Sequence, residues 1–356
     1  MSPIITVDPD KLRQFGPAED ATFCLVTNPE FKDDIVIAKS GQYRDYKVVP
    51  MHRGERFEDL LATIPESAHI FAVSPATFFE SPTGDTLGPR RKLLAMACNS
   101  TPTTLDLIAH FLAVMENTSP AEQDGFSDTF FELLEEADHL VYSDSKRGTK
   151  ATLQHLQDGL VWNQQAGAVG WGEQQIVPAG EISVLPIDIT EFEEDLRLPL
   201  EGEIVIRGYP ILHSGTPSFS RNDQARIYRE LTALHDNAVI ARVEAGEIVD
   251  IRADTPGATP AVNMLNAMFE VDSRYRIVWE MGHALNTSLD LVLGNHAMNE
   301  VYGGTSGCLH WGLGLTPYTQ FHLDIIAPDT TVSTDTGTIV LGVEGGYASD
   351  KIAEDL

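Results

Sequence analysis

The chain has 356 residues, of which 42% are hydrophobic, so it can bury a substantial core in one large domain or two. Acidic residues outnumber basic residues 53 to 24, which gives a formal net charge of −29. Because a surface this negative repels phosphate backbones and anionic lipids, we expect neither nucleic acid nor a membrane surface as a partner.

The ends and the cysteines indicate a cytoplasmic protein. The N-terminal stretch "MSPIITVDPD" lacks the basic region and apolar core of a signal peptide, and no run of 18 apolar residues is present. Cys24, Cys98 and Cys308 lie far apart in apolar surroundings. This pattern is typical of buried free thiols and not of a zinc ribbon or a disulfide framework.

Residues 1–165 show the alternation of an α/β domain. Apolar runs predict buried strands, and apolar residues at helical spacing predict helices. The strands are expected at 21–28, 68–75 and 93–100, and the helices at 56–64, 103–116 and 126–140. Such alternation favours a largely parallel sheet. No GxGxxG or Walker motif occurs, so nucleotide binding is not indicated.

Residues 166–356 read as a mixed α+β domain rich in antiparallel sheet. Glycine-punctuated, β-branched segments predict strands at 180–187, 200–212, 237–254 and 275–282, with a hairpin turn at 244–247 and one helix at 257–269. The stretch 142–170, rich in Ser, Gly and Gln, is the predicted linker between the two domains.

The carboxylates and histidines of this second part form a candidate metal site. His322 and Asp324, in "FHLD", lie on the same side of a strand because strand side chains alternate. Glu181 opens an apolar strand, Glu280 ends the run "RIVWE", and His310 lies in "GCLHWGLG". Each residue alone has an ordinary explanation on the surface, at a cap or in a hydrogen-bonded core. Together they suit one or two divalent ions.

Neighbouring residues receive secondary interpretations. His283 and His296 are expected in turns, with surface roles or roles behind the ligands. Gly303–Gly304 would let the backbone approach the metal site closely. Trp279 and Trp311 are expected in the core or in a pocket wall. No HExxH motif is present, which excludes the zincin arrangement.

Ordered segments resemble the thermophilic metallo-aminopeptidases of the aminopeptidase T family. "IVPAGEISVLP" (176–186) looks like the element that carries their first glutamate, and "EMGHALN" (280–286) is similar to the second. "LGNHAMNEVYGGTSGCLHWGLG" (293–314) resembles their glycine-rich run into a ligand histidine, and "FHLD" matches their closing His-x-Asp. The resemblance spans roughly residues 175–335; the N-terminal part does not visibly match.

The resemblance implies a hydrolase of peptide or amide bonds with two divalent ions of zinc, cobalt or manganese. It implies a small-molecule or short-peptide substrate and a homodimer. Glu181 or Glu280 would also move a proton, and Tyr318, in "TPYTQ", corresponds to the family's site tyrosine. His322 follows His310 by only 12 positions, a shorter spacing than the family leads one to expect. The implied ligands are Glu181, Glu280, His310, His322 and Asp324.

Two alternatives stay open. The 2,5-dihydroxypyridine ring-cleaving dioxygenases resemble the same fold, end in the same His-x-Asp and bind one Fe(II). They carry a histidine where this chain has Glu280, and they lack counterparts of Glu181 and His310, so the retention of all three favours the hydrolase. A non-catalytic binding or assembly protein that has lost its metal is the third possibility.

Overall fold

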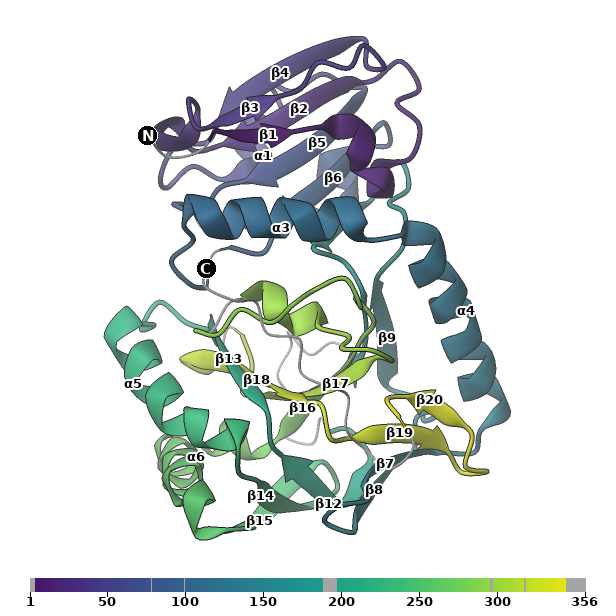
Figure 1. Cartoon of the computed structure of the whole chain (residues 1–356), viewed down its shortest axis with the longest axis vertical. Helices are drawn as coiled ribbons and strands as arrows, with labels where there is room; N and C mark the ends of the chain where they lie inside the picture. The colour runs from purple at the N-terminus through teal and green to yellow at the C-terminus, as the bar shows by residue number, and fades with distance from the viewer. Residues whose placement is uncertain are drawn as a thin grey trace. The chain divides into compact units, whose positions relative to one another are not determined.

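The computed structural model describes residues 4–77, 79–98, 100–187, 197–294, 297–316 and 318–343. The protein is mixed α/β, with several sheets, some parallel and some antiparallel (Figure 1). Contacts group the chain into two compact units. One contains the residues up to Asp124 together with Gln165–Ala179, and the other contains Gly125–Gln164 and most of the chain from Gly180 onward. The predicted domain boundary at residue 165 stays a prediction.

The first unit is built on a parallel sheet, as the sequence pattern predicted. The strand order is β10-β6-β5-β2-β4, and every neighbouring pair is parallel. The strands are β2 (Thr22–Thr27), β4 (Asp45–Pro50), β5 (Ala68–Val73), β6 (Arg91–Met96) and β10 (Gln174–Val177). A separate parallel pair consists of β1 (Ile5–Val7) and β3 (Ile35–Ile37).

Helices of this unit follow the predicted spacing in part. α3 (Leu105–Asn117) begins where the Thr104 side chain accepts a hydrogen bond from the Leu107 amide, and it lies along the sheet (Figure 1). Its Phe111 stacks on Phe71 of β5. The helix predicted at 56–64 is only the single turn α1 (Phe57–Leu60), and residues 61–63 continue as hydrogen-bonded turns. The other short helix is α2 (Gly84–Leu87).

Three longer helices follow in the chain: α4 (Pro120–Glu136), α5 (Arg221–Leu231) and α6 (Thr259–Val271). α4 begins earlier than predicted, where the Ser119 hydroxyl accepts a hydrogen bond from the Glu122 amide. α5 was not predicted, because only Gln224, Ile227 and Leu231 of its eleven residues are buried. α5 and α6 lie side by side (Figure 1).

A seven-stranded antiparallel sheet supports the second unit. Its order is β15-β14-β12-β8-β7-β19-β20, and the predicted hairpin turn joins β14 to β15 through Ala245 and Gly246. The strands are β7 (Leu140–Asp144), β8 (Thr149–Leu153), β12 (Leu200–Ile206), β14 (Val239–Glu244), β15 (Glu247–Ala253), β19 (Thr331–Thr334) and β20 (Ile339–Leu341). The predicted linker 142–170 is wrong: it contains most of β7, all of β8 and β9 (Leu160–Gln165), because side chains such as Tyr142 and Leu153 pack in the core.

A six-stranded sheet carries the candidate site. Its order is β13-β18-β17-β16-β11-β9, and the neighbours from β13 to β11 are antiparallel. The strands are β11 (Glu181–Pro186), β13 (Tyr209–Ser214), β16 (Val278–Ala284), β17 (Cys308–Leu313) and β18 (Phe321–Ala327). The predicted strand 200–212 is split between the two sheets at Gly208, whose φ of 134° suits glycine.

The remaining expectations concern membranes and thiols. Of the helices in the described ranges, none has both the length and the apolarity that crossing a bilayer requires. Cys24, Cys98 and Cys308 are buried thiols outside any disulfide, as the sequence predicted.

Candidate metal centre

The five predicted ligands share one face of the six-stranded sheet. His322 and Asp324 alternate with Leu323 in β18, as predicted. Asp324 lies opposite Gly312, which lies opposite Glu280, while His310 lies opposite Gly282. Because Gly282 also faces Ser183, two residues from Glu181, the register brings β11 into the same row.

Side-chain distances confirm that these residues come together. The Nε2 atom of His322 lies 3.3 Å from an oxygen of Glu280 and 3.1 Å from Oδ1 of Asp324. The Nε2 atom of His310 lies 3.3 Å from Oε1 of Glu181 and 4.0 Å from Oδ1 of Asp324. Asp324 is therefore the residue around which the two histidines are arranged.

Sequence reasoning missed His213 and Glu300, which belong to the same cluster. The Nε2 atom of His213, in β13, lies 3.1 Å from Oδ2 of Asp324 and 3.5 Å from Oε2 of Glu300. Glu300 comes from the 3₁₀ helix Ala297–Val301. His213 reaches the cluster because it lies opposite His322 across β13 and β18, and the sequence does not reveal this register.

Among the described residues, three groups have ligand atoms close enough to hold a metal ion. They are Glu181, Glu300 and His310; His213, Glu300 and Asp324; and Glu280, His322 and Asp324. Metal–ligand bonds of about 2.1 Å place neighbouring ligand atoms about 3.0–3.4 Å apart, so the observed nitrogen–oxygen spacings fit a coordination shell.

Unmatched buried atoms support this interpretation. Both oxygens of Asp324, Oε1 of Glu181 and Nε2 of His310 are buried and make no hydrogen bond, although nitrogen and oxygen atoms lie nearby. A buried carboxylate without a partner is costly. Lone pairs that converge on a common point are what a bound cation requires, so the residues fit a divalent ion.

Two glycines leave the space that the cluster occupies. A Cβ on Gly282 would lie 1.9 Å from Cε1 and 2.0 Å from Nε2 of His310, and 2.6 Å from Oε1 of Glu181. A Cβ on Gly312 would lie 2.8 Å from the Cβ of Glu280 and 3.2 Å from Oδ1 of Asp324. Any other residue at Gly282 would therefore displace two candidate ligands.

The tautomer of His322 suits metal binding. Its Nδ1 atom lies 2.8 Å from the carbonyl oxygen of Gly314, which can only accept, so Nδ1 carries a proton and donates. In the neutral ring Nε2 is then the free lone pair, directed at Glu280 and Asp324. A hydrogen bond on the far ring nitrogen is the usual way in which proteins orient a metal-binding histidine.

Electrostatics of the cluster reflect an excess of buried negative charge. Burial raises the pKa of Glu181, against the opposing effect of His310. Burial likewise raises the pKa of Glu300 to about 8, although His213 counteracts it. Four carboxylates face three imidazoles, so carboxylates are in excess in the cluster.

Ionised partners shift the other groups. Burial alone would lower the pKa of His310, but Glu181 and Asp324 raise it to about 10. The pKa of His322 is raised well above its usual value against the effect of burial, by Asp324 and Glu280. Burial tends to raise the pKa of Asp324 and of Glu280, and the neighbouring His322 outweighs it and lowers both. The cluster thus strongly attracts positive charge.

Exposure shows from which side a ligand reaches the cluster. The side chains of Asp324 and His310 are fully buried, whereas those of Glu280, His322 and Glu300 are 17%, 15% and 26% exposed. Asp324 and His310 therefore form the floor, and the other three form the open side.

His283 lies outside the cluster, and its predicted place in a turn is wrong. It belongs to strand β16, three residues from Glu280, and therefore points to the opposite face. There its Nε2 lies 3.0 Å from the Tyr142 hydroxyl and its Nδ1 3.0 Å from the Ile182 carbonyl oxygen. Burial lowers the pKa of His283 to about 3, so it is a neutral core residue.

The other secondary candidates have mixed outcomes. Trp279 and Trp311 are fully buried, as expected for core residues. Gly303 packs against the backbone of 285–286, where a Cβ would lie 2.7 Å from a carbonyl carbon. His296 lies outside the described residues.

Tyr318 lies beside a small apolar cluster. Its side chain packs against Ile277, Trp279 and Leu315, and the Arg274 guanidinium lies 5.9 Å from its ring centre. Arg274 also donates a hydrogen bond to the Tyr318 carbonyl oxygen. The catalytic role of Tyr318 stays a prediction.

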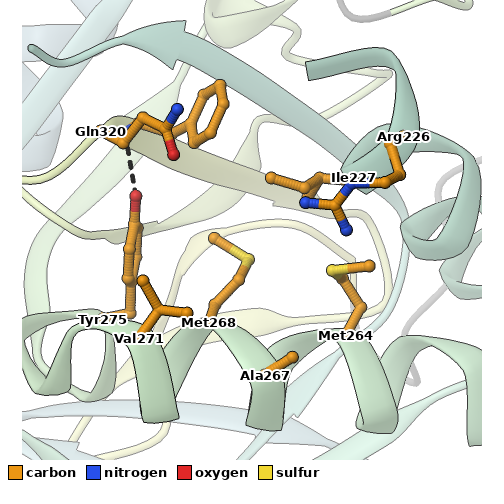
Figure 2. Close-up of a pocket in the computed structure, with 9 residues that line it drawn as sticks. Arg226, Ile227, Met264, Ala267, Met268, Val271, Tyr275 and Gln320 are labelled. Atoms are coloured by element: carbon orange, nitrogen blue, oxygen red, sulfur yellow. Dashed lines mark hydrogen bonds between the residues drawn. The ribbon is translucent and has the colours of Figure 1, made fainter. Parts of the chain in front are cut away.

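A separate apolar pocket of about 90 Å³ lies between α5, α6 and the start of β18 (Figure 2). Ile227, Met264, Met268 and Phe321 contribute to its lining. Because Phe321 and His322 are adjacent in a strand, the pocket faces away from the metal cluster. At its edge the Tyr275 hydroxyl accepts a hydrogen bond from the Phe321 amide, which holds the strand that carries His322.

Comparison with known proteins finds similarity of fold. No family model and no curated protein sequence matches the chain. A solved structure of 2,5-dihydroxypyridine dioxygenase from Pseudomonas putida KT2440 is 13% identical, with a TM-score of 0.53, over 97% of this chain and 96% of that one. Wild-type AmpT from Thermus thermophilus is 11% identical, with a TM-score of 0.43, over 95% and 98%. At these identities the first likeness shows a shared fold, and the second supports no argument.

Proposed function

We propose that the protein is a metal-dependent hydrolase that cleaves a peptide or amide bond at a two-metal centre. The observation that carries this proposal is the convergence of four carboxylates and three histidines on one sheet face, with Asp324 in the middle. When all four carboxylates are ionised, their charge equals that of two divalent ions, whereas a single ion balances only two of them.

Two divalent ions held there would polarise a scissile carbonyl and acidify a water molecule. The chain's own residues would do the rest. Glu181 or Glu280 would take the proton from that water and return it to the leaving amine. The negative cluster would attract the free α-amine of a short peptide or a small amine-bearing substrate, which would enter past Glu280 and His322. A homodimer and a cytoplasmic location complete the proposal.

One observation favours the second candidate, a mononuclear Fe(II) dioxygenase that cleaves a hydroxylated ring. Asp324 lies 3.1 Å from the Nε2 atoms of both His213 and His322. Two histidines and one carboxylate are the ligand set of many non-haem iron oxygenases. In that arrangement Glu181, Glu280 and Glu300 would have no metal ion to bind, which is why the hydrolase is the first proposal.

Metal content per chain is the first measurement, made on wild type, His322→Ala and the control His52→Ala, whose side chain is exposed and lies outside the cluster. The proposal predicts two equivalents of zinc, cobalt or manganese in wild type and in the control, and fewer in His322→Ala. It also predicts release of amino acids from short peptides without oxygen. One equivalent of iron with oxygen-dependent turnover would make the dioxygenase the better assignment. No metal after reconstitution would reject both enzymes.

A second variant tests whether Glu280 belongs to the site. Glu280→Ala should lose activity and metal together, because Glu280 belongs to the candidate ligand group of His322. Full activity and unchanged metal content in Glu280→Ala would contradict the proposed site.

A further inference from the structure

His213 and Glu300 lie on the side of Asp324 that the five sequence-predicted ligands leave open. Oδ1 of Asp324 faces His322 and His310, at 3.1 and 4.0 Å. Oδ2 faces His213 at 3.1 Å. A carboxylate whose two oxygens point at two different ligand groups has the arrangement of a bridge between two ions.

Glu300 connects the remaining ligand atoms. It belongs to the group of His213 and Asp324 and also to the group of Glu181 and His310. Its side chain is three-quarters buried, and its carboxylate lies 3.5 Å from the Nε2 atom of His213. Glu300 is therefore close enough to both groups for its carboxylate to join a coordination shell on this side of Asp324.

We propose that His213 and Glu300 are ligands of the second metal ion, which Asp324 shares with the first. This inference rests on the proposed two-ion centre. The first ion is held by Glu280, His322 and Oδ1 of Asp324. The second is held by His213, Glu300 and Oδ2 of Asp324, and Glu300 also joins Glu181 and His310 to the centre. The centre then has seven protein ligands in place of the five that the sequence pattern indicates.

A purely structural ion pair between His213 and Glu300 is the simpler explanation, and it has different consequences. Its loss would change the stability of the metal-free protein but not the number of ions bound. Loss of a ligand would change the number or affinity of the ions, whatever happens to the metal-free protein. Metal stoichiometry therefore separates the two explanations without any measurement of catalysis.

The test is a Co²⁺ titration of the metal-free protein, followed by the visible absorption of the bound ion. The variants are Glu300→Gln and His213→Asn, with Glu203→Gln and His235→Asn as controls on a partly buried glutamate and histidine outside the cluster. Wild type and controls should bind two equivalents. Each cluster variant should keep one and bind the second about 100-fold more weakly or worse, since even changes behind the ligands cost 10–100-fold.

Each outcome has a defined meaning. Two equivalents at unchanged affinity in both folded variants would overturn the inference and leave the proposed hydrolase standing. A single equivalent in wild type would overturn the two-ion centre and the inference with it. If the variants lose the second ion and the wild-type protein cleaves no peptide bond, the proposed hydrolase is overturned. The assignment of His213 and Glu300 as ligands then stands. If His213→Asn does not fold, the isosteric Glu300→Gln gives the same readout.

Discussion

Replacement of Gly282 by alanine tests whether the space beside His310 is reserved for metal ligands. The new Cβ would lie 1.9 Å from Cε1 of His310 and 2.6 Å from Oε1 of Glu181. Ordinary carbon contacts are about 3.5 Å long, so the imidazole must move by about 1.5 Å. Metal–ligand distances tolerate deviations of about 0.2 Å, and the displaced ring can no longer reach the ion.

We expect Gly282→Ala to lose one metal equivalent. We also expect the free energy of unfolding of the metal-free protein to fall by about 1–3 kcal/mol. Elemental analysis and chemical denaturation measure the two effects. Gly125→Ala is the control, because a Cβ there meets nothing within 4 Å in helix α4. That variant should keep all metal and gain about 0.5–1 kcal/mol. Wild-type metal content and stability in Gly282→Ala would refute the reasoning.

Three further predictions concern other parts of the chain. Gly312→Ala should lose metal affinity less than Gly282→Ala, because its shortest new contact is 2.8 Å, and equal losses in an equilibrium titration would contradict this order. Arg147→Met should lower the free energy of unfolding by about 3–5 kcal/mol, since it leaves Asp144 and Asp329 buried without that partner; a loss below 1 kcal/mol in urea denaturation would count against it. Burial lowers the pKa of His69 to about 4, so the unfolded chain binds the proton first. The contribution of His69 to the free energy of unfolding is complete above pH 6.5 and falls by up to about 3 kcal/mol towards pH 4. In urea denaturation at several pH values, His69→Gln should therefore show a weaker dependence of the unfolding free energy on pH in this range.

Local patterns in the sequence were sufficient for several parts of this protein. Alternation along 321–327 placed His322 and Asp324 on one side, since that geometry depends only on the strand itself. Apolar spacing predicted α3, α6 and the parallel strands β2, β5 and β6, because each buries a face that its own residues define.

The sequence prediction is wrong in the segment 280–286, which fits both a strand and a turn. The sequence predicts that the strand ends at Gly282 and that His283 lies in a turn. In the structure the glycine continues strand β16 and makes room for His310. Once the strand is recognised, the three-residue spacing from Glu280 directs His283 to the opposite face.

Only the tertiary structure shows that His213 and Glu300 join the candidate ligands. His213 meets His322 only because β13 pairs with β18 in one register, and hydrogen bonding between strands distant in sequence leaves no mark in either segment. Glu300 has the sequence context of a surface glutamate, and only the packing of its 3₁₀ helix directs it at His213. The sequence by itself determined which residues can bind a metal and which side of a strand they occupy, because those properties are local. The convergence of six such residues around Asp324 depends on strand register and packing, which are not local properties.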